Sequence, residues 1–268
     1  VLAALGFLEM LMREGKFGSA GSRVVIEEFL RGEETSFMVF SDGTRYRAMV
    51  PSQDHKAIFE GDRGPNTGGM GAYSADFLLP DDLKYRIQTE VVEPTIEGMA
   101  KRGAPFRGVL YAGLMLTDSG PRVLEFNVRL GDPEAQAVLP RLDSDLGEVL
   151  LAVSEHDLSG IEMEWKPDPA VCVVLASKGY PGSYEKGREI TGISMAEEDP
   201  ATVVFQAGTR LEGDRLLTDG GRVLGVTSTA PTLEAAIMRA YEGVNKINFK
   251  DMYCRRDIAA KGLKKLES

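Results

Sequence analysis

The sequence is poor in cysteine, in long apolar runs and in positive charge. Its two cysteines, Cys172 and Cys254, among 268 residues exclude a disulfide framework and a cysteine-rich zinc site, so a reducing cytoplasm is the expected location. No apolar run reaches the roughly 18 residues that a membrane-spanning helix needs, and we expect no membrane partner. The 31 Lys and Arg against 41 Asp and Glu give a net charge of −10, which argues against nucleic acid as a partner.

The composition that is present is that of a globular protein. It is 43% hydrophobic and 27% charged, so the chain can bury a sizeable core and is not a disordered chain. The length predicts about two domains. Residues 1–12 are apolar and helical in pattern, with no basic segment or cleavage site of a signal peptide and no capping residue before them. We therefore expect the sequence to start inside a helix.

The hydrophobic pattern predicts a mixture of strands and helices. Pro94 should kink or split the helix in which it lies, and residues 53–74 are polar and glycine-rich, which is typical of a long functional loop. Residues 156–169 break the composition and suggest a domain boundary. The expected strands are residues 22–30, 35–40, 46–50, 108–117, 122–129, 171–177, 203–207 and 222–228, and the expected helices are residues 1–12, 81–102, 145–154 and 232–246.

The strand at residues 122–129 carries the most informative side chains. Alternation along a strand places Val123, Glu125, Asn127 and Arg129 on one face. Carboxylate and amide oxygens two residues apart can hold a hard cation such as Mg²⁺, and Arg129 could hold an anion beside it. The alternative is an ordinary half-buried strand with one polar face.

A turn with helix-starting residues follows that strand. After Gly131, Asp132 suits a helix N-cap, Pro133 suits the first helical position and Glu134 suits the first turn. The N-terminus of a helix beside a cation site would favour phosphate. The alternative is a well-capped strand–turn–helix connection with no ligand.

Two further segments could contact an anion or a nucleotide. Residues 64–71 contain four glycines, whose backbone N–H groups could converge on an anion, and Asp54, His55 and Lys56 lie just upstream. The alternatives are a flexible turn and a structural histidine. Residues 26–34 could offer backbone groups to an adenine edge near Phe29 and Leu30, with a carboxylate for ribose hydroxyls; the alternative is a strand end with solvated acids.

Taken together, these segments resemble ATP-grasp ligases. The order and spacing are most similar to the phosphoribosylamine–glycine ligase (glycinamide ribonucleotide synthetase) family. The motifs GPNTGGMG and EFNxRxGDPE are the specific ones, whereas no serine-hydrolase, HExxH or GxGxxG pattern is present. The matching stretches are VVIEEFLRGEE (24–34), SQDHK (52–56), GPNTGGMGAYS (64–74), GVLYAGLM (108–115), EFNVRLGDPEAQAVLPRLDSD (125–145) and YCRRDI (253–258).

The resemblance implies a fold and a reaction. The fold would be an α+β ATP-grasp core with a mainly antiparallel sheet, followed by a smaller C-terminal α/β domain. The reaction would use ATP and Mg²⁺ or Mn²⁺ to convert glycine to an acyl phosphate. The amine of 5-phosphoribosylamine would then attack this intermediate, giving glycinamide ribonucleotide, ADP and phosphate in purine biosynthesis. Catalysis would rest on positioning and electrostatics.

The resemblance also implies residue roles. Glu125 and Asn127 would hold the metal, and Arg129 and Asp132 would act at the reacting groups. The nucleotide would be bound by Glu27, Glu28, Phe29, Leu30 and Glu33. The substrate and phosphate loops would comprise Asp54, His55, Lys56, Asn66, Thr67, Gly68, Gly69, Met70, Gly71, Gly131, Pro133 and Glu134.

The sequence departs from the family pattern in several places. Leu130 and Ala135 stand where an aromatic residue and a threonine are expected, and Leu114 and Met115 lie where many ATP-grasp enzymes have a further metal-binding carboxylate. The N-terminal domain and most of the lid are missing, so we expect a C-terminal fragment that is inactive alone. Its parts would be a lid remnant (1–30), the core (31–160) and a C-terminal domain (165–268). The alternatives are another ATP-grasp ligase or carboxylase and a non-catalytic binding module.

Overall fold

The computed structural model describes residues 2–267 and divides into two compact units between Arg31 and Gly32. The first unit contains α1 (Leu2–Met12), as expected, and a 3-10 turn η1 (Gly18–Ser22); Val1 lies outside the described residues. The strand expected at residues 22–30 is wrong, because residues 23–31 have no regular secondary structure. The β-branched residues favour extended backbone, but a strand also needs a partner, and Phe29 is 83% exposed.

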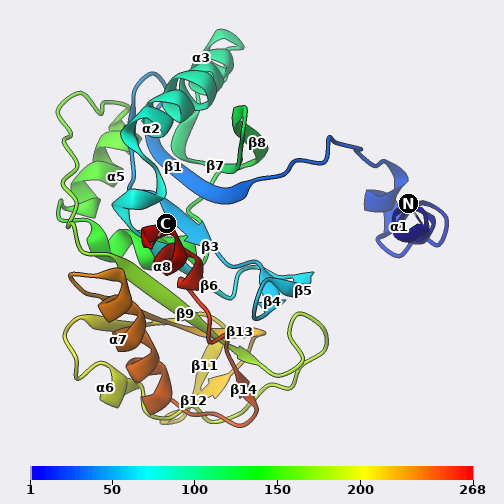
Figure 1. The fold of residues 1–268 in the computed structure, drawn as a ribbon, viewed down its shortest axis with the longest axis vertical. Coiled ribbons are helices and arrows are strands. Elements are labelled where there is room, and N and C mark those ends of the chain that lie inside the picture. Colours follow the sequence, from blue (N-terminus) through cyan, green and yellow to red (C-terminus); the bar gives the residue numbers. More distant parts are fainter. Residues whose placement is uncertain (1, 268) are drawn as a thin grey trace. The chain divides into compact units, whose positions relative to one another are not determined.

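The second unit is built around a ten-stranded sheet in which every pairing is antiparallel (Figure 1). The mainly antiparallel α+β fold expected from the sequence is therefore confirmed. Eight strands follow one another across the sheet, and two further strands pair at its sides, β2 (Tyr46–Ala48) with β1 and β14 (Met252–Tyr253) with β9. The order is β10 (Thr202–Gln206), β13 (Arg222–Thr229), β9 (Ala170–Ser177), β6 (Gly71–Ser74), β3 (Ser52–Asp54), β1 (Glu33–Asp42), β7 (Arg107–Thr117) and β8 (Gly120–Asn127).

Alternation along β1 explains how helices cover both faces of its part of the sheet. Phe37 and Val39 pack with α2 (Asp81–Ile87) and α3 (Glu93–Lys101) on one face. Met38 and Phe40 pack with α5 (Leu146–Glu155) on the other. Side chains of successive strand residues point to opposite faces, so one strand contributes to two cores.

A third core lies around β9 and β13 and is covered by α7 (Leu233–Lys246). The helices expected at residues 232–246 and 145–154 are both present, and each begins at a side-chain cap. Thr232 caps α7 by accepting from the Ala235 N–H, and Asp145 caps α5 by accepting from the Gly147 N–H. The remaining helical elements are η2 (Asp76–Leu78), α4 (Glu134–Val138), η4 (Leu139–Arg141), α6 (Ile193–Ala196) and α8 (Ala260–Leu266).

The helix expected at residues 81–102 is split near its proline. A π-helical turn, η3 (Gln88–Val92), separates α2 from α3, and Pro94 stands in the first turn of α3. Proline has no N–H to donate to the preceding turn, so the split before Pro94 follows from its chemistry. Among residues 2–267, no helix is both long and apolar enough to cross a bilayer.

The long loop expected at residues 53–74 is wrong in detail. It contains β3, β6 and a separate hairpin of β4 (Ala57–Phe59) and β5 (Arg63–Asn66). These strands are only three or four residues long, so they carry no readable alternation. Of these strands, β3 and β6 form by pairing within the large sheet, where β6 lies between β3 and β9, whereas β4 and β5 pair with each other. The pairing of β6 with β9 joins strands from before and after residue 160 in one sheet. A domain division near residue 160 stays a prediction.

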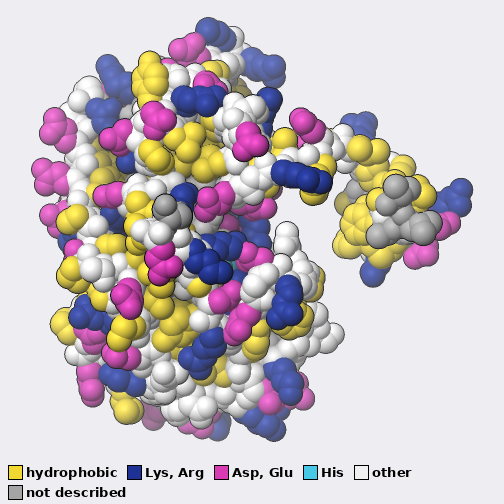
Figure 2. All heavy atoms as spheres, viewed as in Figure 1, with side chains coloured by type: hydrophobic (Ala, Val, Ile, Leu, Met, Phe, Trp, Pro, Cys, Tyr) yellow, Lys and Arg dark blue, Asp and Glu magenta, His cyan; other side chains and the backbone are white. Residues whose placement is uncertain are grey.

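A second small hairpin joins β11 (Thr209–Glu212) and β12 (Arg215–Thr218). Acidic and basic side chains are interspersed with apolar ones over the face shown in Figure 2. A mixed surface of this kind carries its net charge without one dominant patch.

Candidate functional site

Two cavities in the second unit share Asp54 and Lys56 as lining residues. The first has a volume of about 420 Å³ and the second about 140 Å³. Both contain the end of β3 and the loops after it; the first adds the start of β1, and the second adds residues of β7, of β8 and of the turn after β8. The first is lined by Gly32, Glu33, Glu34, Gln53, Asp54, Lys56, Ala57, Asp62, Asn66, Met115 and Lys261, and the second by Asp54, Lys56, Thr67, Gly68, Tyr111, Glu125, Asn127, Arg129, Asp132 and Glu134.

The polar face at the end of β8 lines the second cavity. Glu125 and Asn127 do share this face, since the Asn127 Nδ2 donates to the Glu125 Oε1 over 3.0 Å. The expectation for Val123 is wrong: the register shifts so that Glu125 pairs with Gly113 but Val123 pairs with Leu114. An extra residue in one strand breaks the two-residue alternation beyond it.

The oxygen atoms at this position suit a hard divalent cation. Asn127 donates through its Nδ2, which leaves its Oδ1 beside the exposed Glu125 carboxylate as a second oxygen ligand. Among the residues described, no three His, Cys, Asp or Glu side chains form a metal cluster. Two protein ligands are enough for Mg²⁺, which usually takes its other ligands from water and substrate phosphates. The residues therefore fit a cation that a nucleotide helps to hold.

A buried carboxylate, Glu134, closes the inner side of the second cavity. It is 3% exposed and accepts hydrogen bonds from the Tyr111 hydroxyl and, over 3.1 Å, from the Ser36 hydroxyl. Burial, together with the charges of Glu134 and Asp54, raises the pKa of Tyr111, so its hydroxyl stays a donor. We did not predict Ser36 and Tyr111; the available signal was a tyrosine within an otherwise apolar strand.

Asp54 lies at the junction of the two cavities in an environment that disfavours its charge. Burial and the neighbouring Glu134 carboxylate raise the pKa of Asp54 to about 7, although Lys56 opposes the shift. Burial disfavours the charge of Lys56 as well, but its 2.7 Å contact with Glu34 and the charge of Asp54 raise the pKa of its ammonium. The site thus holds an excess of negative charge that a cation would relieve.

The helix N-terminus expected at Asp132 is wrong. The helix α4 begins at Glu134 and has five residues, and Pro133 occupies the cap position without a side-chain cap. The Asp132 carboxylate instead accepts from the Arg222 Nη2 over 2.9 Å and from the Gln136 Nε2 over 3.0 Å. The Asp132 carboxylate, which local sequence predicts to cap the helix, thus binds the guanidinium of Arg222 from a distant strand.

Arg222, from β13, joins two of the predicted site loops. Its Nη1 donates to the carbonyl oxygens of Gly68 and Asp132 over 2.7 and 2.8 Å. The approach is close: a Cβ on Gly68 would lie 3.0 Å from the Arg222 Cζ, and one on Gly69 would lie 2.4 Å from the Pro133 Cδ. Glycine is needed at position 69, where φ is +112°, and a larger residue at position 68 would press on the Arg222 guanidinium. No local signal distinguishes Arg222 from other strand residues.

The predicted glycine-rich loop is divided between exposed and buried residues. Asn66 lines the first cavity, and Thr67 and Gly68 line the second. Five other predicted residues are buried and line neither cavity: Gly69, Met70, Gly71, Gly131 and Pro133. These five residues therefore pack beneath the loops and do not form a wall of either cavity.

His55 is also buried, at 1% exposure, and lines neither cavity. Its Nε2 accepts from the Ala259 N–H over 3.3 Å, and its Nδ1 has no hydrogen-bond partner among the described residues. Burial, with the positive charges of Arg255 and Lys261, lowers the pKa of His55 to about 4. The imidazole is therefore neutral at pH 7.

The predicted nucleotide-binding residues fall in both units. Glu33 lines the first cavity, where its carboxylate accepts from the Gln53 Nε2 over 2.9 Å and pairs with Lys265. Burial opposes its charge, but these hydrogen bonds lower the pKa of Glu33. Glu27, Glu28, Phe29 and Leu30 belong to the first unit, and their role at the nucleotide stays a prediction.

Comparison with known proteins shows the family of the chain. The chain matches the family models for the phosphoribosylglycinamide synthetase ATP-grasp (A) domain over residues 2–135 and C domain over residues 170–261. It is 51% identical to a phosphoribosylamine–glycine ligase of Allochromatium vinosum, over 93% of this chain and 58% of that protein. It is 49% identical to the bifunctional purine biosynthetic protein ADE1 of Schizosaccharomyces pombe, over 94% of this chain and 32% of that protein.

Solved structures show the same fold. The phosphoribosylamine–glycine ligase of Thermotoga maritima superposes with a TM-score of 0.77 at 39% identity, covering 86% of this chain and 56% of that one. A biotin carboxylase domain from Hydrogenobacter thermophilus superposes with a TM-score of 0.67 at 11% identity, covering 93% of this chain and 53% of that one. The chain spans between 25% and 60% of the length of the curated relatives that it matches.

Proposed function

Because the chain belongs to the phosphoribosylglycinamide synthetase family, we propose that it supplies the ATP-grasp core of a ligase for glycine and 5-phosphoribosylamine. The reaction consumes ATP and yields glycinamide ribonucleotide, ADP and phosphate. The single observation that carries the proposal is the second cavity, an acidic pocket that Glu125, Asn127, Lys56 and Arg129 all line. Oxygen ligands beside fixed cations are what phosphoryl transfer needs.

In this proposal, Glu125 and Asn127 hold a divalent cation, Mg²⁺ or Mn²⁺. A bound cation of this kind neutralises charge on the nucleotide phosphates during transfer. Lys56 and Arg129 bind the transferred phosphoryl group by charge. Glu33 binds the ribose hydroxyls, and residues 27–30 (Glu27, Glu28, Phe29 and Leu30) contact the adenine.

The chemistry then runs in two displacements. A glycine carboxylate oxygen attacks the terminal phosphorus of ATP, and ADP leaves. The amine of 5-phosphoribosylamine next attacks the acyl carbon, phosphate leaves and the amine loses a proton. Asp132 lies beside the reacting groups, and Thr67 and Gly68 enclose them. The chain's main contribution is to hold charges and reactants in place.

The relatives are longer than this chain, and the complete reaction belongs to their full length. We therefore propose that residues 1–30 are part of a lid, residues 31–160 the core and residues 165–268 a C-terminal domain of a larger cytoplasmic enzyme. The 268-residue chain alone would then show little turnover. Neither nucleic acid nor a membrane is proposed as a partner.

The test measures ADP release by the full-length enzyme that carries this chain. We expect release to require both glycine and phosphoribosylamine, and Glu125→Gln to lower kcat/KM about 100-fold, since a charged metal ligand is lost. Glu97→Gln, on an exposed helix position, is the matched control and should leave the rate unchanged. ADP release that depends on bicarbonate instead of glycine, or an unaffected Glu125→Gln enzyme, would contradict the proposal.

A further inference from the structure

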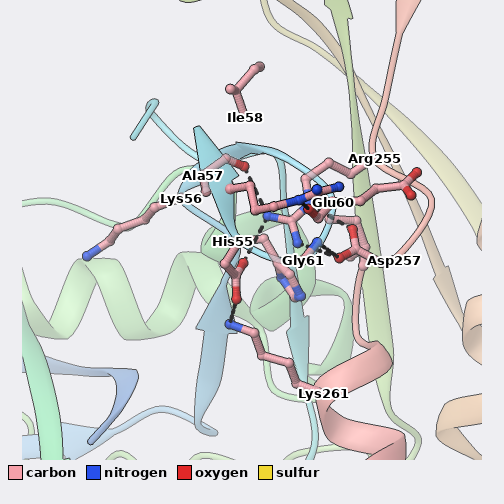
Figure 3. A network of polar contacts seen from close by, with 12 residues as sticks. His55, Lys56, Ala57, Ile58, Glu60, Gly61, Arg255, Asp257 and Lys261 are labelled. Atoms are coloured by element: carbon pink, nitrogen blue, oxygen red, sulfur yellow. Dashed lines mark hydrogen bonds and ion pairs between the residues drawn. The ribbon is translucent and has the colours of Figure 1, made fainter. Parts of the chain in front are cut away.

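The segment at residues 253–261 contains the YCRRDI motif, for which the proposed reaction has no use. It lies against the loop and hairpin at residues 55–62, which are almost 200 residues earlier in the sequence (Figure 3). The Tyr253 hydroxyl donates to the Ile58 carbonyl oxygen over 2.9 Å, and the Ala259 N–H donates to His55. Lys261 forms an ion pair with Asp62. Polar contacts therefore run along the whole length of this junction.

Arg255 is the centre of the junction and is 0% exposed. Its Nη1 donates to the Ala57 carbonyl oxygen and to the Asp62 Oδ1, each over 3.0 Å. Its Nε and Nη2 donate to the two carboxylate oxygens of Asp257 over 2.8 and 2.7 Å. A planar guanidinium can serve all these acceptors at once, which the ammonium of a lysine cannot do.

Asp257 extends the same contact to the hairpin turn. Its Oδ2 accepts from the Gly61 N–H over 2.8 Å while it pairs with Arg255. Burial opposes its charge, but the hydrogen bonds from Arg255 and Gly61 lower the pKa of Asp257 to about 2. The acid is thus ionised at neutral pH and ties Arg255 and the turn together.

The hairpin needs this external support. The strands β4 and β5 pair with each other and, within the described part of the chain, with no strand of the ten-stranded sheet. A lone two-stranded hairpin is at best marginally stable in water. Yet Lys56, Asp62 and Asn66, at the hairpin and its base, all line the first cavity.

We infer that Arg255 is a positioning residue of the candidate site: through Ala57 and Asp62 it holds the hairpin where Lys56 and Asn66 line the first cavity. The inference rests on the proposed function for the identity of the ligand, MgATP. It assigns to the C-terminal segment a role in nucleotide binding that is exerted without contact with the nucleotide. The role is specific to the hairpin and differs from a general contribution to folding.

Kinetics can separate positioning from folding. In Arg255→Lys the charge remains but the fork of hydrogen bonds is lost, so the hairpin occupies its binding position for a smaller fraction of the time. Apparent affinity falls by that fraction, and saturating nucleotide restores the ordered state. We expect the KM for MgATP to rise about tenfold with kcat within about twofold. A purely structural role would lower the amount of active enzyme, reducing kcat at an unchanged KM.

Arg141→Lys is the matched control. Arg141 is also 0% exposed, and its guanidinium donates to the Ser74 Oγ and the Asp76 Oδ1, each over 2.8 Å, and to the Lys166 carbonyl oxygen. None of these partners lines either described cavity. Both variants lose a buried fork and should lower Tm to a similar degree, but Arg141→Lys should leave the KM for MgATP within about twofold.

Hydrogen exchange gives a second readout that needs no ligase activity. Arg255→Lys should speed exchange of the amides at residues 57–66 at least about tenfold relative to those of β9, and Arg141→Lys should not. If Arg255→Lys fails to fold, Asp257→Asn replaces it, with an expected KM increase of about threefold. An inactive wild-type enzyme would refute the proposed function while the exchange data still test the inference. Unchanged hairpin exchange, or an equal change in both arginine variants, would overturn the inference.

Discussion

Around Arg255 and around Asp54, the same kinds of charged group are arranged in different ways. Arg255 has Asp62 and Asp257 within 3.0 Å, and Lys261 also pairs with Asp62, so two cations balance two carboxylates; the other acceptor of Arg255 is a backbone carbonyl. The second cavity instead brings four carboxylates, those of Asp54, Glu125, Asp132 and Glu134, against Lys56 and Arg129. One region matches its charges and the other leaves negative charge in excess.

The pKa values record this difference. Hydrogen bonds from Arg255 lower the pKa of Asp257 to about 2, whereas burial beside Glu134 raises that of Asp54 to about 7. Unmatched charge costs folding free energy, and a protein tolerates it where a ligand supplies the missing charge. The comparison therefore separates the region around Arg255, which supports the site, from the second cavity, which is suited to bind a charged ligand.

The largest effect is expected from removing the matched charge. Arg255→Met should lower the free energy of unfolding by about 3–5 kcal/mol, because two carboxylates and a carbonyl lose a buried partner. Urea denaturation measures it, with Arg256→Met at the exposed neighbouring position as the control that changes little. An Arg255→Met protein as stable as the wild type would show that the charge matching around Arg255 does not support the fold.

The opposite sign is expected at Asp54. Its folded-state pKa of about 7 lies above the ordinary value of 3.8, so ionisation destabilises the folded protein above pH 7 and has no effect below about pH 4. Asp54→Asn should therefore raise the free energy of unfolding by about 1–3 kcal/mol at pH 8 and leave it unchanged at pH 4. Denaturation at both pH values measures this; a variant less stable than the wild type at pH 8 would contradict the expectation.

Arg222 supports the second cavity from outside its lining and sharpens the comparison. Its side chain is 21% exposed and holds the Gly68 and Asp132 loops together. We expect Arg222→Met to lower kcat/KM about tenfold, equivalent to about 1.4 kcal/mol, through misplaced loops. Arg239→Met, which loses a similar contact to Asp199 and the Thr229 carbonyl away from the cavities, should leave kcat/KM unaltered in the same assay.

The smallest effect is the acid dependence of Asp257. Because its folded-state pKa of about 2 lies below the ordinary 3.8, its contribution is complete above about pH 4 and is lost as the pH falls towards 2. This group should account for about 1 kcal/mol of the stability lost over that interval. Comparing the pH dependence of unfolding in wild type and Asp257→Asn checks it: equal slopes between pH 4 and 2 would count against the assignment.

Local sequence was a good guide where the interactions are local. The alternation that placed Glu125 and Asn127 on one face spans two residues, and the helix expected at residues 232–246 begins where Thr232 accepts from the Ala235 N–H, three residues further along the chain. The same reasoning failed for Val123, where a register shift against β7 intervenes. It also failed for Asp132, whose carboxylate binds Arg222, 90 residues away. Pairing with distant residues overrides local preference at both positions.

By itself, the sequence determined the family, the antiparallel α+β fold and the Glu125–Asn127 pair, because motif order and short-range periodicity are properties of consecutive residues. Tertiary structure decided that His55 is buried and neutral, that β4 and β5 form a hairpin, and that Arg222 and Arg255 hold the site loops. The burial of His55 and the contacts of Arg222 and Arg255 depend on residues 90 to 204 positions apart. Such contacts exist only after the sheet has brought the distant segments together.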